Sequence, residues 1–315
     1  MYFYFYMPPV ITVNNLCKKF KDLTAVDNLS FTVNKNDIYG FLGQNGAGKS
    51  TTIRMLLTLI APTGGEINIF EKNLHTHRAE ILQNVGAVIE KPDMYKYLSA
   101  WQNLSIFARM SGVKPTKKLL MDQLEMVGLA DRAHSKVKTF SQGMKQRLGI
   151  AIALVHDPQL IVLDEPTNGL DPQGIADMRN LILTLSKKMG KTILISSHLL
   201  SEIQLIANRM LIINKGKKMA EGNVAELMDP SQTIVTVSST DDASTKAKLL
   251  TTQWSQFLLE EKGIRLRMDK KQIPALTENM VNAGVGILSI EPRHSLEDYF
   301  LSLTNEHGHV EAFTN

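Results

Sequence analysis

The 315-residue chain has a single cysteine, Cys17, so no disulfide can form within it. A chain without internal disulfides fits a reducing compartment such as the cytoplasm. Long apolar runs are also lacking, because the run at residues 53–61 is interrupted by Arg54 and the run at residues 149–155 stops at His156. Neither approaches the roughly 18 apolar residues of a membrane-spanning helix. We therefore expect no transmembrane segment.

Charge of one sign is not in large excess. The formal net charge is +4, from 35 Lys and Arg against 31 Asp and Glu, and these residues are spread along the chain. Such a weak bias does not favour nucleic acid as a partner. Residues 1–9, MYFYFYMPP, have no basic start and no small-residue cleavage site. We expect that they are not a secretory signal and take Met7 as a candidate translation start.

The order of apolar segments predicts two domains. In the first, two strand-like segments precede a short apolar strand that leads into a glycine-rich loop and a helix beginning near Lys49. Residues 92–156 carry apolar side chains at helical spacing, which predicts a helical insertion, and further strands alternate with helical stretches as in a parallel sheet. The strands expected here are residues 11–13, 29–33, 38–42, 160–163, 192–196 and 210–213.

The composition changes after about residue 223, where Ser, Thr, Asp and Lys become frequent. Strand-like segments at residues 234–237, 264–268 and 287–290 are separated by helical stretches. This pattern indicates a small α+β unit. We expect one domain over residues 10–222 and an accessory domain over residues 223–315.

A phosphate-binding pattern follows the strand at residues 38–42. It reads G-x-x-x-x-G-K-[ST] and consists of Gly43, Gln44, Asn45, Gly46, Ala47, Gly48, Lys49 and Ser50. Glycines let successive backbone N–H groups converge on phosphate oxygens at the start of a helix. Lys49 is expected to bind the β and γ phosphates and Ser50 to ligate Mg²⁺, with Thr51 as a further nucleotide contact. The alternative, an ordinary glycine turn with a surface lysine, explains neither the full pattern nor its strand–loop–helix context.

Hydrolysis requires carboxylates beside this loop. The apolar strand at residues 160–163 ends in Asp164 and Glu165, which a parallel sheet would place at the same edge as the loop. We expect Asp164 to orient Mg²⁺ through its water shell and Glu165 to polarise the attacking water. The alternative is a pair of solvated carboxylates at a strand end.

Together with further motifs, these residues resemble the nucleotide-binding domain of ABC transporters over about residues 10–222. The resemblance implies an α/β P-loop NTPase fold with an antiparallel β piece and a helical insertion, followed by the small α+β domain. It also implies ATP and Mg²⁺ as cofactors and ATP hydrolysis coupled to transport across a membrane.

Two further motifs carry the resemblance. Phe-Ser-Gln-Gly-Met at residues 140–144 stands where the family has Leu-Ser-Gly-Gly-Gln, and Gly-Leu-Asp-Pro at residues 169–172 matches the D-loop. The family resemblance implies a head-to-tail dimer that holds two ATP molecules between the loop of one subunit and this signature of the other. Ser141, Gly143 and Asp171 are therefore predicted nucleotide contacts, although the signature departs from the usual form at residues 142 and 144.

The resemblance assigns roles to two more side chains. His198 matches the switch histidine, which would contact the γ-phosphate and hold Glu165 and the water in register. Phe20 stands where the family has an aromatic side chain that stacks on adenine. The alternatives are a histidine with satisfied hydrogen bonds at a strand end and a phenylalanine of the hydrophobic core.

Glu90 stands where most of the family has a glutamine. With the signature segment and Ser-Leu-Glu-Asp-Tyr-Phe-Leu at residues 295–301, it makes the chain resemble the bacitracin-resistance and lantibiotic-immunity branch. Members of that branch expel antimicrobial peptides. The predicted metal-binding residues are then Ser50, Asp164 and Glu90. The alternative for Glu90 is a charged loop residue without a catalytic part.

The resemblance implies a separate integral-membrane permease as partner and a peripheral position at the cytoplasmic face of the cell membrane. Other readings remain open: an exporter of another substrate, a membrane-free ATPase of the same superfamily, or a small-molecule P-loop kinase. Membrane-free relatives carry two cassettes or a long coiled coil, and this sequence has neither. A kinase would not require the signature, D-loop and switch histidine in this order.

Overall fold

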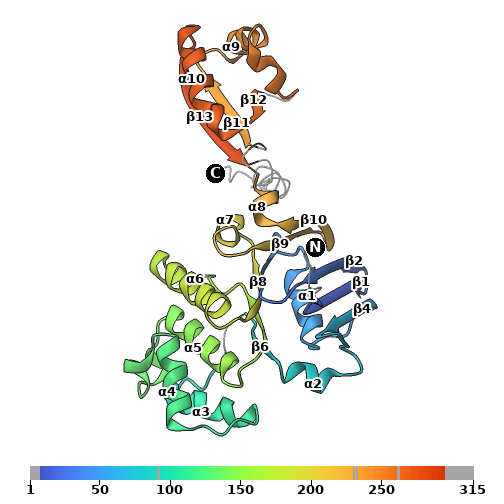
Figure 1. Cartoon of the computed structure of the whole chain (residues 1–315), viewed down its shortest axis with the longest axis vertical. Helices are drawn as coiled ribbons and strands as arrows, with labels where there is room; N and C mark the ends of the chain where they lie inside the picture. The colour runs from blue at the N-terminus through green and yellow to red at the C-terminus, as the bar shows by residue number, and fades with distance from the viewer. Residues whose placement is uncertain (1–7, 91–92, 230, 232, 261–262, 295–315) are drawn as a thin grey trace, which may run out of the picture. The chain divides into compact units, whose positions relative to one another are not determined.

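The computed structural model describes residues 8–90, 93–229, 231, 233–260 and 263–294 (Figure 1). They form two compact units that divide between Gly222 and Asn223. Residues 1–7, which include the candidate start Met7, and the segment at residues 295–301 lie outside the described residues.

A six-stranded sheet forms the centre of the first unit, with the strand order β10-β9-β3-β8-β7-β6. β3 pairs in parallel with β8 and β9, and β7 pairs in parallel with β6 and β8. The four strands predicted for this sheet are confirmed, whereas β6 and β10 were not predicted. The bounds are β3 Ile38–Leu42, β6 Val85–Val88, β7 Leu160–Asp164, β8 Thr192–Ser197, β9 Arg209–Asn214 and β10 Lys217–Asn223.

The apolar composition of the central strands follows from their position in this sheet. Every residue of β3, β7 and β8 is buried, because both faces of the sheet are covered. Their register places Leu42 beside Ser197 and Asp164 beside Ser196. The loops that follow these strands therefore begin at one edge of the sheet.

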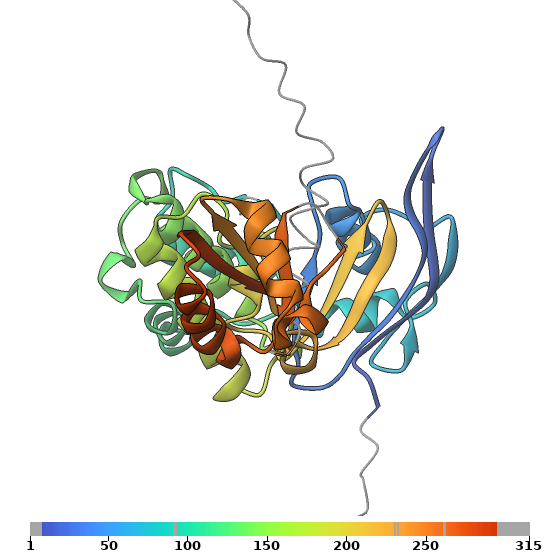
Figure 2. The same ribbon diagram turned by 90° about the horizontal axis from the view of Figure 1, so that it is seen from above.

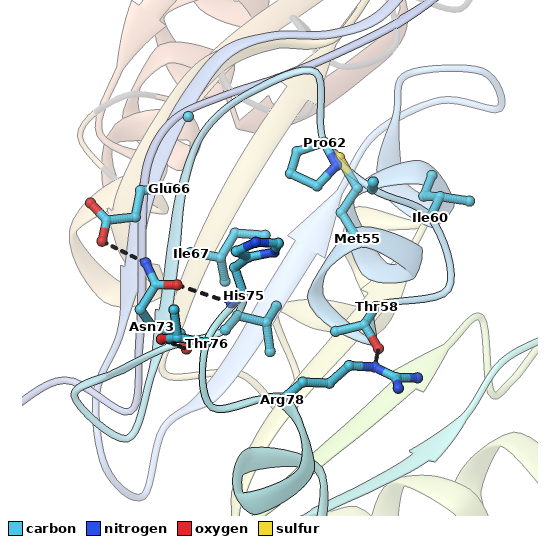
Figure 3. A pocket seen from close by; sticks show the side chains of 13 residues that line it. Met55, Thr58, Ile60, Pro62, Glu66, Ile67, Asn73, His75, Thr76 and Arg78 are labelled. Atoms are coloured by element: carbon cyan, nitrogen blue, oxygen red, sulfur yellow. Dashed lines mark hydrogen bonds between the residues drawn. The ribbon is translucent and has the colours of Figure 1, made fainter.

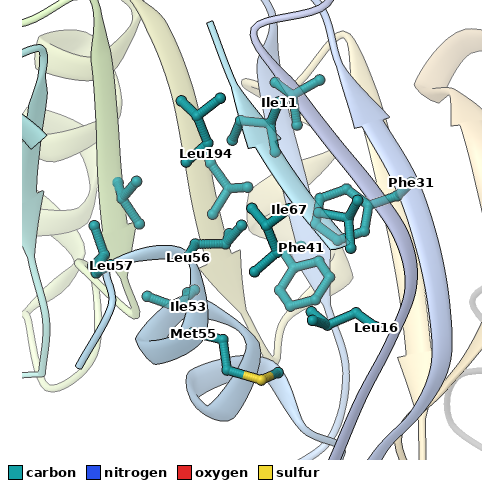
Figure 4. Packing of buried hydrophobic residues seen from close by; sticks show 14 of the residues in the cluster. Ile11, Leu16, Phe31, Phe41, Ile53, Met55, Leu56, Leu57, Ile67 and Leu194 are labelled. Carbon is teal, nitrogen blue, oxygen red and sulfur yellow. The ribbon is translucent and has the colours of Figure 1, made fainter. Parts of the chain in front are cut away.

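A second sheet of the first unit is antiparallel and has the order β2-β1-β4-β5. Its strands are β1 Ile11–Phe20, β2 Leu23–Val33, β4 Gly64–Ile69 and β5 Lys72–Asn73. The two strands predicted here are confirmed within longer ones. Phe31 of this sheet packs on Phe41 of β3 with ring centroids 5.6 Å apart, and Ile53 belongs to the same core (Figure 4). The helix that carries Ile53 and Lys49 is thereby fixed to the hydrophobic core.

Among the helices of the first unit, α3, α4 and α5 lie together on the side opposite the four-stranded sheet (Figures 1 and 2). Ser99 caps α3 and forms a capping box with Gln102. No described helix is long and apolar enough to cross a membrane. The bounds are α1 Lys49–Leu56, α2 Arg78–Leu82, α3 Ala100–Met110, α4 Lys117–Met126, α5 Gln142–Leu154, α6 Pro172–Lys187 and α7 Leu200–Ile203, with 3₁₀ turns at Ala130–Arg132 and Val137–Thr139.

The second unit contains an antiparallel sheet of order β12-β11-β13. Its hydrophobic core includes Trp254, Leu266 and Leu276. All three strands predicted for this unit are confirmed. The bounds are β11 Thr233–Ser239, β12 Ile264–Met268, β13 Ile287–His294, α8 Val224–Leu227, α9 Asp242–Leu250 and α10 Ile273–Asn282, with 3₁₀ turns at Gln253–Phe257 and Lys270–Gln272.

Candidate active site

The glycine-rich loop joins β3 to α1, and part of the loop is exposed to solvent. Gly48 caps α1 with φ 106°, and a Cβ at this position would lie 2.6 Å from the carbonyl oxygen of Ala25. Only glycine fits such a conformation without strain. The Gly43 N–H donates to the Ser197 carbonyl at 3.4 Å, which ties the loop to the end of β8. Asn45 and Gly46 remain exposed at the tip of the loop.

Lys49 is 5% exposed and lies within the loop rather than extending into solvent. Its Nζ donates to the carbonyl oxygens of Gly43 at 2.7 Å and Gln44 at 3.2 Å. It also forms an ion pair with the Glu165 carboxylate at 3.2 Å. The lysine therefore connects the loop with the carboxylate that follows β7.

The ends of β7 and β8 are joined by side-chain hydrogen bonds. Asp164 is 1% exposed and accepts from the Ser196 hydroxyl at 2.5 Å, and that hydroxyl accepts from the Glu165 N–H at 2.9 Å. The second carboxylate oxygen of Glu165 lies 2.8 Å from His198 Nδ1. The structure thus places Lys49 and His198 on the Glu165 carboxylate and connects Asp164 to the Glu165 backbone through Ser196.

Ser50, Asp164 and Glu165 line a cleft of about 890 Å³. Four lining residues on α5 or in the loop after β7 were not predicted as site residues: Gln142, Lys145, Gln146 and Asn168. Only their nearness in the sequence to the signature motif, or to the D-loop for Asn168, could have indicated them. The cleft is large enough for a small-molecule ligand.

The residues of this edge fit a nucleoside triphosphate with Mg²⁺. Ser50 and Asp164 supply hydroxyl and carboxylate oxygens, the ligand types that Mg²⁺ prefers, and Lys49 supplies a buried cation. No cluster of three or more His, Cys, Asp or Glu that could hold a metal exists among the described residues.

Glu90 lies at the end of β6 and lines the same cleft. Its backbone has φ 55°, an uncommon conformation for a residue other than glycine. Its carboxylate forms an ion pair with Arg54 in the last turn of α1, and both side chains are largely exposed. Arg54 would therefore compete with a metal ion for the Glu90 carboxylate.

Ser141, Gly143 and Asp171 lie apart from the loop and line a second cavity of about 380 Å³. The Ser141 hydroxyl caps α5, and the Asp171 carboxylate caps α6. Gln142 donates to the Asn168 carbonyl at 3.0 Å and so connects the signature with the segment before the D-loop. These predicted contacts line a different cavity from Asp164, and Gln142 lines both cavities.

Phe20 ends β1 in the antiparallel sheet. Its side chain is 45% exposed, and Lys18 Nζ lies 4.8 Å from the ring centroid. The alternative of a core phenylalanine is therefore wrong. The ring is available to a ligand, and its stacking on adenine stays a prediction.

Another cavity, of about 720 Å³, lies at the far end of α1 from Lys49 (Figure 3). Met55 and Ile67 line it, and Arg78 Nε donates to the Thr58 hydroxyl at 2.6 Å at its side. None of the predicted catalytic or metal-binding residues lines this cavity. It is therefore separate from the nucleotide cleft.

Comparisons with known proteins identify the family of the chain. Residues 26–168 match the ABC transporter family. The bacitracin transport ATP-binding protein BcrA of Bacillus licheniformis is 43% identical over 303 residues, which cover 94% of this chain and 98% of BcrA. The chain belongs to the ABC transporter ATP-binding family. It is an ABC-type ATPase with a P-loop NTPase fold.

Two further comparisons define the branch and the fold. The lantibiotic transport ATP-binding protein SrtF of Streptococcus pyogenes is 42% identical over 212 residues, covering 67% of this chain and 90% of SrtF. The resemblance of this ABC protein to the bacitracin and lantibiotic branch is thereby confirmed. The solved structure of CbiO1 from Clostridium perfringens, part of an ABC transporter complex, matches with a TM-score of 0.64. It covers 78% of this chain and 96% of CbiO1 at 23% identity, which supports the fold alone. ABC ATPases of this kind bind ATP, typically dimerise and typically pair with transmembrane subunits.

Proposed function

We propose that this chain is the ATP-hydrolysing subunit of an exporter that protects a cell against antimicrobial peptides of the bacitracin or lantibiotic type. The observation that supports hydrolysis most directly is that the Glu165 carboxylate contacts both Lys49 and His198. The peptide class rests on the transport functions in the names of BcrA and SrtF. An exporter of another substrate is the second candidate.

These contacts suggest a separate role in hydrolysis for each of the three residues. Lys49 supplies positive charge to the β and γ phosphates, and Glu165 accepts a proton from the attacking water. His198 fixes the orientation of the Glu165 carboxylate, because its Nδ1 binds one of the two oxygens. When bound, Mg²⁺ would neutralise phosphate charge, with Ser50 and Asp164 as its protein-side groups.

The second cavity supports a dimer as the active form. Ser141, Gly143 and Asp171 line a different cavity from Ser50 at the end of the glycine-rich loop. A head-to-tail homodimer would bring the signature of one protomer to the nucleotide held by its partner. ATP then lies between the two protomers.

A separate permease would anchor this subunit at the cytoplasmic face of the membrane. We place its contact at the Glu90 loop and the adjoining residues 93–98. Tyr95 and Tyr97 are 54% and 78% exposed, and exposed aromatic side chains are typical of protein interfaces. Photo-cross-links from Tyr97 to an integral-membrane protein would support this contact, whereas cross-links formed only from residues 223–294 would contradict it.

Growth of a deletion strain in a panel of peptide antibiotics tests the substrate class. We expect deletion to lower the inhibitory concentration of bacitracin or a lantibiotic, and the wild-type gene to restore it. The Lys49→Ala gene serves as the control and should restore nothing. Unchanged sensitivity to every cationic and cyclic peptide, with altered sensitivity to an unrelated drug, would favour the second candidate.

Substitution of Glu90 tests the coupling between ATP hydrolysis and transport. A glutamine keeps an oxygen acceptor but loses the negative charge that faces Arg54, so we expect Glu90→Gln to retain ATP binding and hydrolysis. Protection against the peptide should fall more than ATPase activity, because the loop that joins the ATP core to the helical insertion is altered. Glu90→Ala should lower both further. Parallel ATPase and resistance assays measure the two effects.

Two variants control for loss of an exposed ion pair. Arg54→Gln breaks the same pair from its other side, and Glu80→Gln breaks the Lys72–Glu80 pair in the same unit. Exposed pairs contribute about 0–1 kcal/mol, so neither should unfold the protein. If Arg54→Gln lowers resistance relative to ATPase activity as Glu90→Gln does, the Arg54–Glu90 ion pair is required for coupling. Wild-type values for both Glu90 variants in both assays would make Glu90 a bystander.

A further inference from the structure

Glu202 connects two segments that carry predicted catalytic residues. It lies in α7, and its Oε2 accepts one hydrogen bond from the Thr167 hydroxyl at 2.6 Å and another from the Ser197 hydroxyl at 3.3 Å. Thr167 comes two residues after Glu165, and Ser197 directly precedes His198. One carboxylate oxygen therefore joins the loop after β7 to the end of β8.

The same two segments also meet through their catalytic side chains, which completes a ring of covalent and hydrogen bonds. The Glu165 carboxylate lies 2.8 Å from His198 Nδ1 on one side of this ring, and Glu202 joins the segments on the other. The Ser197 hydroxyl that donates to Glu202 also accepts from the Leu199 N–H at 3.0 Å. That hydroxyl therefore anchors the backbone on both sides of His198.

The backbone of Glu165 has a conformation that needs support from its surroundings. Its φ is 49°, which is uncommon for a residue other than glycine and persists only where neighbouring contacts hold it. Pro166 follows and is buried, and its ring restricts the backbone further. Thr167 comes next, and its hydrogen bond to Glu202 fixes the chain just beyond this conformation.

Glu202 acts from a fixed position outside the nucleotide cleft. Ile203, its neighbour in α7, is fully buried, and a Cβ on Gly40 of β3 would lie 2.2 Å from the Ile203 side chain. Helix α7 therefore packs directly against the backbone of the central sheet. Neither Glu202 nor Thr167 lines the cleft that contains Asp164. A direct contact of Glu202 with the nucleotide is therefore not part of its role.

We infer that Glu202 is a positioning residue that ties the loop after Glu165 to the segment of His198 and thereby keeps the His198–Glu165 contact in place during hydrolysis. This inference rests on the proposed roles of Glu165 and His198. Nucleotide binding is assigned to Lys49 and the glycine-rich loop. Loss of Glu202 should therefore lower kcat, while Kd for ATP stays within about twofold of wild type.

The experiment compares Glu202→Met with Glu202→Gln in the full-length chain. Methionine has a similar length but no acceptor for the two hydroxyls, so we expect kcat to fall about tenfold, as for loss of one hydrogen bond that acts in the transition state. Both hydroxyls bind the same oxygen, so the amide oxygen of a glutamine can accept from both. Glu202→Gln should therefore keep the wild-type kcat. Thr167→Val removes one donor and should lower kcat in the same direction as Glu202→Met.

Glu221→Met is the matched control for the loss of a carboxylate acceptor. Glu221 also accepts from a hydroxyl, that of Tyr39 at 2.8 Å, and belongs to the same unit, but it binds neither segment that Glu202 joins. Both methionine variants should lower Tm, because each leaves a hydroxyl without its acceptor. Only Glu202→Met should lower kcat per folded molecule. An equal loss of kcat in both variants would overturn the inference.

The NMR signals of the His198 ring nitrogens, recorded without nucleotide, test the positioning independently of hydrolysis. The signals are assigned by their absence in His198→Ala, and they respond to the hydrogen bonding and protonation of the ring. We expect Glu202→Met to shift the Nδ1 signal and Glu221→Met to leave it unchanged. An unshifted signal in Glu202→Met would overturn the inference.

The kinetic results separate a failure of this inference from a failure of the proposed function. Wild-type kcat in both Glu202→Met and Thr167→Val, beside an inactive Glu165→Gln, would show that only the role of Glu202 is wrong. A change confined to Kd for ATP would also overturn that role. Wild-type hydrolysis by Glu165→Gln would instead overturn the proposed catalytic site and the inference together.

Discussion

Replacing Lys49 with alanine is expected to abolish ATP turnover. The lysine is the cation that the structure places between the glycine-rich loop and Glu165, with Nζ 3.2 Å from the carboxylate. Its loss removes positive charge from the β and γ phosphates and leaves Glu165 without its ion pair. A deficit of a few kcal/mol corresponds to roughly a hundredfold or more in rate. Steady-state phosphate release and nucleotide binding measure the effect.

Lys191→Ala is the matched control for Lys49→Ala. Lys191 is 7% exposed and pairs with Asp157 at 2.6 Å, so its loss also removes a buried lysine from an ion pair. It stands just before β8, whereas the nucleotide site lies beyond the other end of that strand. We expect a lower Tm but retained ATPase activity. Near-normal turnover in Lys49→Ala would contradict the assignment of the phosphate-binding loop.

The sequence allowed the central strands and the catalytic edge to be predicted because their signals are local. β3 and β7 are short apolar runs, and each is followed directly by its functional residues. A parallel sheet then brings those residues to one edge without further information. His198 was assigned from the family resemblance, and its 2.8 Å contact with Glu165 could be seen only in the structure.

β6 could not be predicted with comparable ease. It has four residues and includes Gly86, a poor strand former in isolation. The glycine is required by packing, because a Cβ there would lie 2.2 Å from the carbonyl oxygen of Ala153 on α5. This requirement depends on Ala153, which is distant from Gly86 in the sequence. β6, the strand that precedes Glu90, could therefore be assigned only from the structure.

Side-chain partners across long sequence separations were beyond sequence reasoning for the same reason. The pairing of Glu90 with Arg54 of α1 joins residues that are distant in the sequence, and no motif specifies it. Tyr39 is another case: its hydroxyl donates to Glu221 at 2.8 Å, and burial, with the nearby Glu221 carboxylate, raises the pKa of Tyr39 far above its usual range. That partly buried hydrogen bond connects β3 with β10, a strand that was not predicted from the sequence.

The geometry around Glu165 separates nucleotide binding from hydrolysis. One carboxylate oxygen faces Lys49 Nζ at 3.2 Å, and the other faces His198 Nδ1 at 2.8 Å. A glutamine keeps the shape of this side chain and can still bond to both neighbours, but it cannot take a proton from water. Binding should therefore survive the substitution while the chemical step does not.

Glu165→Gln is accordingly expected to bind ATP with near wild-type affinity and to lower hydrolysis by about 10²–10⁴-fold, the usual contribution of a general base. ATP that is not hydrolysed should hold two protomers together, which size-exclusion chromatography with light scattering detects in the presence of ATP and Mg²⁺. Glu221→Gln is the control, because Glu221 is buried to a similar degree, 16% exposed against 18%, and also forms ion pairs. That control should retain hydrolysis per folded molecule and show no added dimer. A Glu165→Gln protein that stays monomeric at saturating ATP would contradict the head-to-tail dimer, and one that hydrolyses ATP at the wild-type rate would contradict the role of Glu165.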